Sequence, residues 1–158
     1  GVAQHPILTS DLTVDHKLVY SSHDYSWDQN NNYNQLEKQL NENWGYIFND
    51  STKAYYAPVW MGEFGECHEN NGNCLQSQWW QSITEYAKNY DFEWGYWAID
   101  GTESTGKGRC YGCDESYGIL NRTWNGVASP VLLKDLQALL KPKLGASGRF
   151  HHPLEREH

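Results

Sequence analysis

The chain has 158 residues and a formal net charge of −8, and it is rich in aromatic rings, with 8 Trp and 11 Tyr against only 4 Phe. The acidic balance argues against a nucleic-acid partner, because the phosphate backbone selects basic surfaces, and no apolar run approaches the roughly 20 residues that cross a membrane. We therefore expect a single domain with its own hydrophobic core and no nucleic-acid or membrane partner.

The first predicted element is a short buried strand at residues 17–21. It leads into a polar cluster at residues 22–25, in which we expect Asp24 to cap the end of the strand. Asn- and Gln-rich sequence follows, and it contains four apolar or aromatic residues at the spacing of an amphipathic helix, namely Tyr33, Leu36, Leu40 and Trp44.

The second predicted strand, residues 57–62, has a carboxylate at its mouth: Glu63 stands between Gly62 and Gly65. An ionised carboxylate resists leaving water, so an acid beside a buried strand indicates a specific role. The glycines allow backbone or a ligand to come close. Local sequence alone also permits a structural interpretation, in which Glu63 caps the loop that follows.

The second half of the sequence predicts two helices and one strand. Ser77 has the position of an N-cap, and the helix behind it carries the apolar stripe Trp80, Ile83 and Ala87. A third strand covers residues 93–99 and opens into a long Gly-rich loop. Ser129 and Pro130 then start a last helix. Its inward residues are Leu132, Leu133, Leu136, Leu139 and Leu140.

The order strand, helix, strand, helix, strand, helix predicts an α/β fold with parallel strands and crossover helices. Polar and aromatic groups follow each strand, at the sheet end where such folds bind ligands. Three parallel strands leave bare edges, whereas a closed (β/α)8 barrel needs eight. The sequence therefore predicts the closing part of a barrel at residues 1–144. We expect the tail at residues 145–158 to be disordered or foreign to the domain.

The four cysteines form two close pairs, Cys67 with Cys74 and Cys110 with Cys113. Together with sequons at residues 49–51 and 121–123, they indicate an oxidising, secreted context. Four cysteines allow three pairings, and we favour two local disulfides that each close a loop. Structural zinc is a weaker alternative, because Cys110 and Cys113 have knuckle spacing but no matching knuckle exists. We expect no metal and no cofactor.

Four strings in this chain resemble glycoside hydrolase family 5, the cellulase family of α/β barrels. Residues 60–65, Trp-Met-Gly-Glu-Phe-Gly, resemble the strand that carries the family's nucleophile. Residues 18–25 are similar to its sixth strand, residues 43–48 to the segment before its seventh, and residues 96–101 to its eighth. The resemblance covers roughly residues 1–140. It implies that this chain carries strands six to eight of the barrel, without strands one to five.

The resemblance implies a secreted, retaining endo-β-1,4-glucanase that binds β-glucan polysaccharide or oligosaccharide. Glu63 would be the catalytic nucleophile, Tyr25 would donate a hydrogen bond to it, and His23 would line the same cleft. Trp97 would form an apolar platform under the sugar ring. Further glucan-binding residues on the same rim would be Trp27, His68, Asp100 and Glu103.

The family's general acid/base is the Glu of an Asn-Glu-Pro triplet, and this triplet does not occur in the sequence. Glu42 follows an Asn but precedes Asn43 on a predicted helix, so it does not take that role. We therefore expect the isolated chain to be inactive. Two other interpretations stay open: a noncatalytic carbohydrate-binding fragment that uses Trp27 and Trp97, and a half-barrel that self-associates or joins a separate N-terminal half.

Overall fold

The computed structural model describes residues 12–14, 17–28, 32–68, 74–90 and 93–140. In this part of the chain three parallel strands form one sheet in the order β1-β2-β3. The strands are β1 (Tyr20–Tyr25), β2 (Val59–Gly65) and β3 (Glu93–Tyr96). The predicted alternation of strands and helices is therefore confirmed. The tail predicted at residues 145–158 lies outside the described residues.

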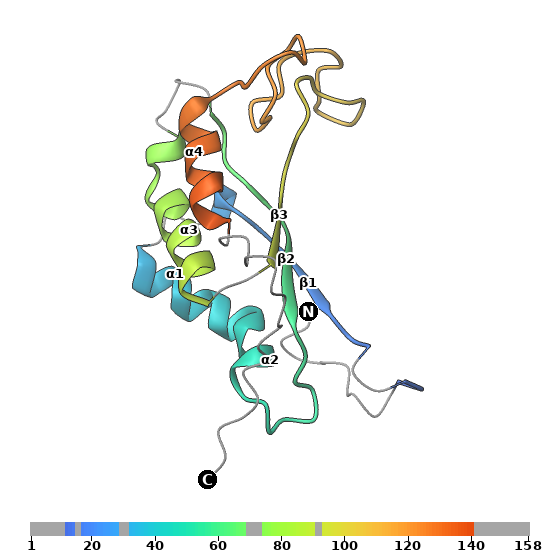
Figure 1. Cartoon of the computed structure of the whole chain (residues 1–158), viewed down its shortest axis with the longest axis vertical. Coiled ribbons are helices and arrows are strands. Elements are labelled where there is room, and N and C mark those ends of the chain that lie inside the picture. The colour runs from blue at the N-terminus through green and yellow to red at the C-terminus, as the bar shows by residue number, and fades with distance from the viewer. Residues whose placement is uncertain (1–11, 15–16, 29–31, 69–73, 91–92, 141–158) are drawn as a thin grey trace, which may run out of the picture.

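The helices pack on one side of the sheet (Figure 1). They are α1 (Tyr33–Leu40), α2 (Tyr46–Asn49), α3 (Gln78–Tyr90) and α4 (Pro130–Leu139). A π-helical turn at Asn41–Gly45 joins α1 to α2, and 3₁₀ turns occupy Ser26–Asp28 and Cys74–Gln76. No helix among the described residues is long and apolar enough to cross a membrane.

Side-chain caps fix the starts of two helices as the sequence predicts. Ser77 Oγ accepts a hydrogen bond from the Trp80 amide at 3.0 Å, and Ser129 Oγ accepts one from the Leu132 amide at 3.3 Å. Each such cap contributes about 1 kcal/mol. Because α4 ends at Leu139, the prediction that Leu140 points inward is wrong, and this side chain is 62% exposed.

The core lies between the sheet and the helices. Phe64 of β2 is fully buried, and its ring lies 5.6 to 5.9 Å, centre to centre, from three other aromatic rings, those of Trp80, Trp94 and Tyr96. The residues that were predicted at helical spacing supply much of the rest, with Leu36, Leu40, Trp44, Ile83 and Ala87 all buried. Burial of this apolar face holds the helices on the sheet.

The strand boundaries differ from the prediction. Residues 22–25 belong to β1, and Glu63 lies inside β2 rather than after it, whereas β3 already ends at Tyr96. The prediction that Asp24 caps the strand is wrong as well: Asp24 is 7% exposed within β1 and accepts a hydrogen bond from Trp44 Nε1 at 3.5 Å.

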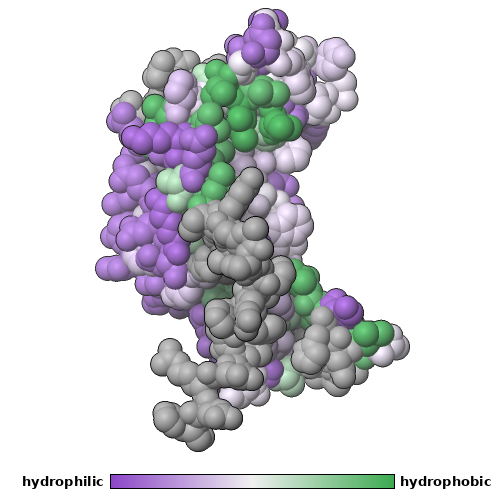
Figure 2. All heavy atoms as spheres, viewed as in Figure 1, coloured by the Kyte–Doolittle hydropathy of each residue, from purple (hydrophilic) through white to green (hydrophobic). Residues whose placement is uncertain are grey.

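The opposite face of the sheet is left uncovered by helices (Figure 1). Trp60 of β2 is 44% exposed there, although its strand neighbours Val59 and Met61 are buried. Apolar atoms also gather where the loop after β3 approaches the start of α4 (Figure 2). Val127 and Val131 are exposed in these two segments. The strand alternation therefore leaves Trp60 on a face that other strands of a barrel would enclose.

Candidate active site

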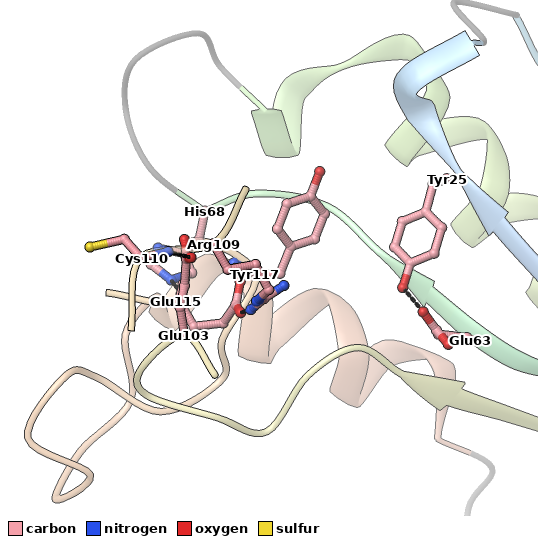
Figure 3. Close-up of polar contacts among 8 residues, drawn as sticks. All are labelled: Tyr25, Glu63, His68, Glu103, Arg109, Cys110, Glu115 and Tyr117. Atoms are coloured by element: carbon pink, nitrogen blue, oxygen red, sulfur yellow. Dashed lines mark hydrogen bonds and ion pairs between the residues drawn. The ribbon is translucent and has the colours of Figure 1, made fainter. Parts of the chain in front are cut away.

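Glu63 is held by two residues of the neighbouring strand. The Tyr25 hydroxyl donates a hydrogen bond to Glu63 Oε1 (Figure 3), and His23 Nδ1 lies 3.3 Å from Glu63 Oε2. The Glu63 side chain is 27% exposed and the His23 side chain 59%, so both reach solvent. The predicted nucleophile and its two predicted neighbours thus lie together.

A β-bulge gives Glu63 this position. Ser22 pairs with Met61 but His23 pairs with Glu63, so Gly62 is an extra residue in β2. In regular pairing without the bulge, Gly62 would face His23 and Glu63 would face Asp24. Bulges re-aim side chains in this way next to active sites. A Cβ at position 62 would lie 2.1 Å from Ser21 Oγ, so this hydroxyl would have to rotate away if Gly62 were replaced.

Tyr25 is suited to remain a hydrogen-bond donor. Burial, and next the hydrogen bond to Glu63, raise the pKa of Tyr25 well above the ordinary tyrosine value of about 10. The folded-state pKa lies above the unfolded value, so the stability from this bond is fully present below about pH 10 and is lost as pH rises through the folded pKa.

We expect Tyr25→Phe to remove one phenol that ionises above pH 10 in the native chain. Near-ultraviolet absorbance of tyrosinate, followed during an alkaline titration, measures this phenol. In the folded state the two curves should coincide near pH 10, whereas in denaturant, where burial and the Glu63 contact are both lost, the native sequence should show one additional phenol that titrates near pH 10. An additional phenol that titrates near pH 10 in the folded native chain would contradict the effect of burial and the Glu63 bond on Tyr25.

Three aromatic rings, those of Tyr25, Trp27 and Tyr117, form an aromatic wall beside Glu63. The Tyr25 ring stacks on Trp27 with centroids 4.2 Å apart and planes at 20°, and Tyr117 meets Tyr25 edge-on at 6.2 Å. Trp27 remains 67% exposed. Rings that combine an apolar face with an accessible edge are suited to sugar rings.

Trp97 is placed next to the same strand end. Its amide donates to the Phe64 carbonyl at 2.9 Å, its side chain is 40% exposed, and its peptide bond to Ala98 is cis. A Cβ on Gly65 would lie 2.4 Å from the Trp97 carbonyl oxygen. Asp100 follows on the same segment and is half-buried. The predicted platform residue is therefore close to β2 because position 65 is glycine.

His68 and Glu103 lie in a second cluster, which Figure 3 shows apart from the Tyr25–Glu63 pair. His68 Nε2 lies 3.1 Å from the Glu115 carbonyl oxygen. Glu103 Oε2 accepts a hydrogen bond from the Cys110 amide at 2.7 Å, and its backbone bonds Gly112 and Cys113. These contacts fold the loop after β3 rather than point the two side chains toward Glu63.

Both predicted disulfides are present, Cys67–Cys74 and Cys110–Cys113. Glu66 is 3% exposed beside the first, and its carboxylate accepts hydrogen bonds from Ser77 Oγ and the Cys67 amide, each at 3.0 Å. Glu66, Cys67 and Cys74 are the one group of potential metal ligands among the described residues. Because the two sulfurs are joined to each other, this group offers a metal only the Glu66 carboxylate.

Sequence reasoning missed Tyr117 and the ion pair between Arg109 and the buried carboxylate of Glu115. All three residues belong to the loop after β3, and no local motif marks them. Tyr117 reaches Tyr25 and Trp27 only because the loop returns across the ends of β1 and β2.

The site thus combines a carboxylate and a tyrosine on adjacent parallel strands of an α/β fold with the rings of Trp27 and Tyr117, an arrangement suited to a carbohydrate ligand. The model of the cellulase family, glycosyl hydrolase family 5, matches residues 1–103. The chain therefore belongs to glycoside hydrolase family 5, which confirms the resemblance in the sequence.

Relatives and solved structures agree with this assignment. An endoglucanase from Paenibacillus polymyxa is 29% identical over 108 residues, which cover 63% of this chain and 25% of that protein. An endocellulase from Pyrococcus horikoshii, solved in complex with cellotetraose, superposes with a TM-score of 0.55 at 23% identity, over 78% of this chain and 31% of its own. A cellulase–inhibitor complex gives a TM-score of 0.60 at 21% identity, and the superposition covers 87% of this chain and 34% of the cellulase chain.

These likenesses show that the sheet and helices belong to the barrel fold of endocellulases. The chain spans about a quarter to a third of the length of the proteins that it matches.

Proposed function

We propose that this chain is the part of a retaining endo-β-1,4-glucanase that carries the catalytic nucleophile, Glu63. The observation that carries the proposal is the contact of Glu63 with Tyr25 and His23 at the carboxyl ends of adjacent parallel strands. In α/β barrels, catalytic groups stand at this end of the strands. We also propose that β1, β2 and β3 are strands six, seven and eight of the barrel.

In the proposed reaction the Glu63 carboxylate attacks the anomeric carbon of a β-glucan, and the bond to the leaving-group oxygen breaks. A second carboxyl about 5–5.5 Å away protonates that oxygen and then takes a proton from the water that hydrolyses the glycosyl enzyme, which releases the sugar and frees the Glu63 carboxylate. Tyr25 orients Glu63 and, as a donor, favours its ionised form. Glu42 does not supply the second carboxyl, because it lies in the helix layer and pairs with Lys38 at 3.8 Å.

The remaining predicted site residues are assigned to the glucan. His23 bonds a sugar hydroxyl, and Trp97 and Trp27 offer exposed rings to sugar faces. His68, Asp100 and Glu103 hold the rim on which the glucan lies. Two disulfides are compatible with the proposal that the protein is secreted.

A chimera tests the proposed function. The matched stretch of this chain replaces its counterpart in the Paenibacillus polymyxa endoglucanase, which joins Glu63 to strands from that relative. We expect the chimera to hydrolyse carboxymethyl cellulose with retention of anomeric configuration. A chimera that is folded by circular dichroism, binds cello-oligosaccharides and yet hydrolyses no β-glucan would contradict the proposal.

We expect the isolated 158-residue chain to hydrolyse no β-glucan, because it lacks the Asn-Glu-Pro acid/base. Release of reducing sugar from carboxymethyl cellulose measures this. Robust turnover by the purified chain would show that the acid/base lies within it. Activated aryl glycosides are unsuitable substrates for this assay, since their leaving groups need little protonation.

The exposed rings of Trp27 and Trp97 favour a second function for the isolated chain, noncatalytic glucan binding. Calorimetry with cello-oligosaccharides, combined with the activity assay, separates binding from catalysis. The uncovered sheet face favours a third, assembly with a complementary half-barrel or with a second copy (Figure 1). A folded, soluble monomer in light scattering would contradict that assembly.

A further inference from the structure

The loop after β3 forms a lobe beyond the carboxyl ends of the strands (Figure 1). The family match ends at residue 103, so most of this loop lies outside it. The disulfide Cys110–Cys113 closes one part of the loop, and the amide of Ile119 returns to the Ala98 carbonyl at 2.9 Å. The lobe is therefore ordered by its own contacts and stands on the side where the glucan is proposed to bind.

Tyr117 is the residue of this lobe that reaches the Tyr25–Glu63 pair. Figure 3 shows it between that pair and the Arg109–Glu115 ion pair. Its ring centre lies 6.2 Å from that of Tyr25 and 6.4 Å from that of Trp27. Among the described residues its hydroxyl has no hydrogen-bond partner, which leaves a donor and an acceptor for a ligand.

A buried carboxylate holds the backbone of Tyr117. Glu115 is 4% exposed, and its Oε1 accepts a hydrogen bond from the Tyr117 amide at 3.2 Å. Its Oε2 accepts one from Arg109 Nη2, and its amide donates to the Gly101 carbonyl at 3.3 Å. Because moving Glu115 would leave its buried carboxylate without these partners, the contacts hold the loop in one conformation around Tyr117.

We propose that Tyr117 is a glucan-binding residue, that it forms a sugar subsite with the exposed face of Trp27, and that Glu115 with Arg109 positions it. The proposal rests on the proposed function and adds to it a subsite outside the family match. A pyranose ring lays its C–H face on an aromatic ring and bonds its equatorial hydroxyls to donors such as a phenol. Trp27 supplies the face and Tyr117 supplies the hydroxyl.

The protonation state of the Tyr117 phenol does not change over the neutral pH range. Burial, followed by the nearby carboxylates Glu66 and Glu115, raises the pKa of Tyr117 above its ordinary value. The phenol therefore stays protonated and donates to a sugar oxygen throughout the neutral range.

Calorimetric titration of the 158-residue chain with cellotetraose tests the subsite. We expect Tyr117→Ala to weaken binding about tenfold and Tyr117→Phe about fivefold, since the latter loses one neutral hydrogen bond. Tyr111 is the matched control: it lies on the same loop, is 80% exposed and stands outside the aromatic wall. Tyr111→Ala should change the affinity by less than about twofold.

The outcomes separate this inference from the proposed function. Loss of binding in Trp27→Ala with unchanged binding in Tyr117→Ala contradicts the subsite and leaves the proposed function standing. An equal loss in Tyr111→Ala and Tyr117→Ala also contradicts it, because the effect would then be general to the loop. A native chain that does not bind cellotetraose contradicts the subsite, and the chimera then decides the proposed function separately.

The positioning role of Glu115 has its own readout. We expect Glu115→Gln to weaken cellotetraose binding about fivefold in the native chain and to have no further effect in a Tyr117→Ala background. Near-ultraviolet circular dichroism confirms that each variant is folded. Additive losses in the double variant would show that Glu115 does not act through Tyr117 and would overturn its assignment as a positioning residue.

Discussion

Replacing Glu63 with Gln in the chimera is expected to reduce the hydrolysis of carboxymethyl cellulose on the order of 10⁴-fold or more, because the amide cannot form the glycosyl enzyme. Binding of cello-oligosaccharides should persist, since Gln has the shape of Glu and still accepts the hydrogen bond from the Tyr25 hydroxyl. The rate loss should therefore fall on kcat rather than on KM. Steady-state kinetics and calorimetry measure the two quantities separately.

Glu85→Gln is the matched control, because Glu85 is an exposed carboxylate on α3, in the helix layer. It should leave kcat within about twofold of the parent chimera. Near-normal hydrolysis by Glu63→Gln would exclude Glu63 as the nucleophile.

Azide gives an independent chemical test in the Glu63→Ala variant of the chimera. Azide can attack the anomeric carbon of an activated aryl glucoside from the vacated side, and the bond to the aryl oxygen breaks as the phenolate leaves. The expected product is a glycosyl azide of inverted configuration. A rate that does not respond to azide, in a variant that still binds substrate, would count against a nucleophilic role for Glu63.

Much of the site could be predicted because its signals are local. Glu63 stands out beside its glycines, Tyr25 and His23 follow the preceding strand, and close cysteines pair. The strand order and the rule that parallel strands end at the same edge place these strand residues together, whereas their roles come from the resemblance to the family. That rule suffices to bring Tyr25 and His23 to Glu63.

The strand boundaries could not be predicted because they depend on pairing. The extra residue Gly62 extends β2 through Glu63 and changes which residue of β1 faces it. Alternation of apolar and polar residues does not reveal such a bulge, since Ser22 and His23 look like a turn when read alone. The same limit applies to Asp24, whose burial depends on Trp44 from the π-helical turn.

The positions of Tyr117, Glu115 and Arg109 depend on longer-range contacts. Gly-rich sequence predicts a loop, but the direction in which the loop returns is set by contacts such as that of the His68 amide with the Ser116 carbonyl at 2.7 Å. Such contacts join segments far apart in the sequence and leave no periodic pattern. For this reason the sequence indicates Glu103 as a glucan-binding residue and does not indicate Tyr117.

Gly65→Ala is expected to destabilise the chain by about 3 kcal/mol, because the new Cβ collides with backbone. It would lie 2.4 Å from the Trp97 carbonyl oxygen and 3.0 Å from Tyr117 Cδ1. The Trp97 carbonyl cannot rotate away freely, since the Trp97 amide is bonded to the Phe64 carbonyl at 2.9 Å. The segment after β3 must therefore shift, and it carries Trp97 away from Glu63. Urea unfolding measures the loss of stability as a lower midpoint with an unchanged m-value.

Gly106→Ala is the control for the change from glycine to alanine. Its Cβ would approach only the flexible side chain of Arg109, with Cδ at 3.2 Å, so stability should change by no more than about 0.5 kcal/mol. Equal losses in the two variants would mean that the cost does not arise from the Trp97 carbonyl. A stable Gly65→Ala chain that binds cellotetraose normally would show that β2 and Trp97 need not approach so closely. Position 65 therefore links the stability of the sheet edge to the placement of the sugar platform, and one substitution tests both.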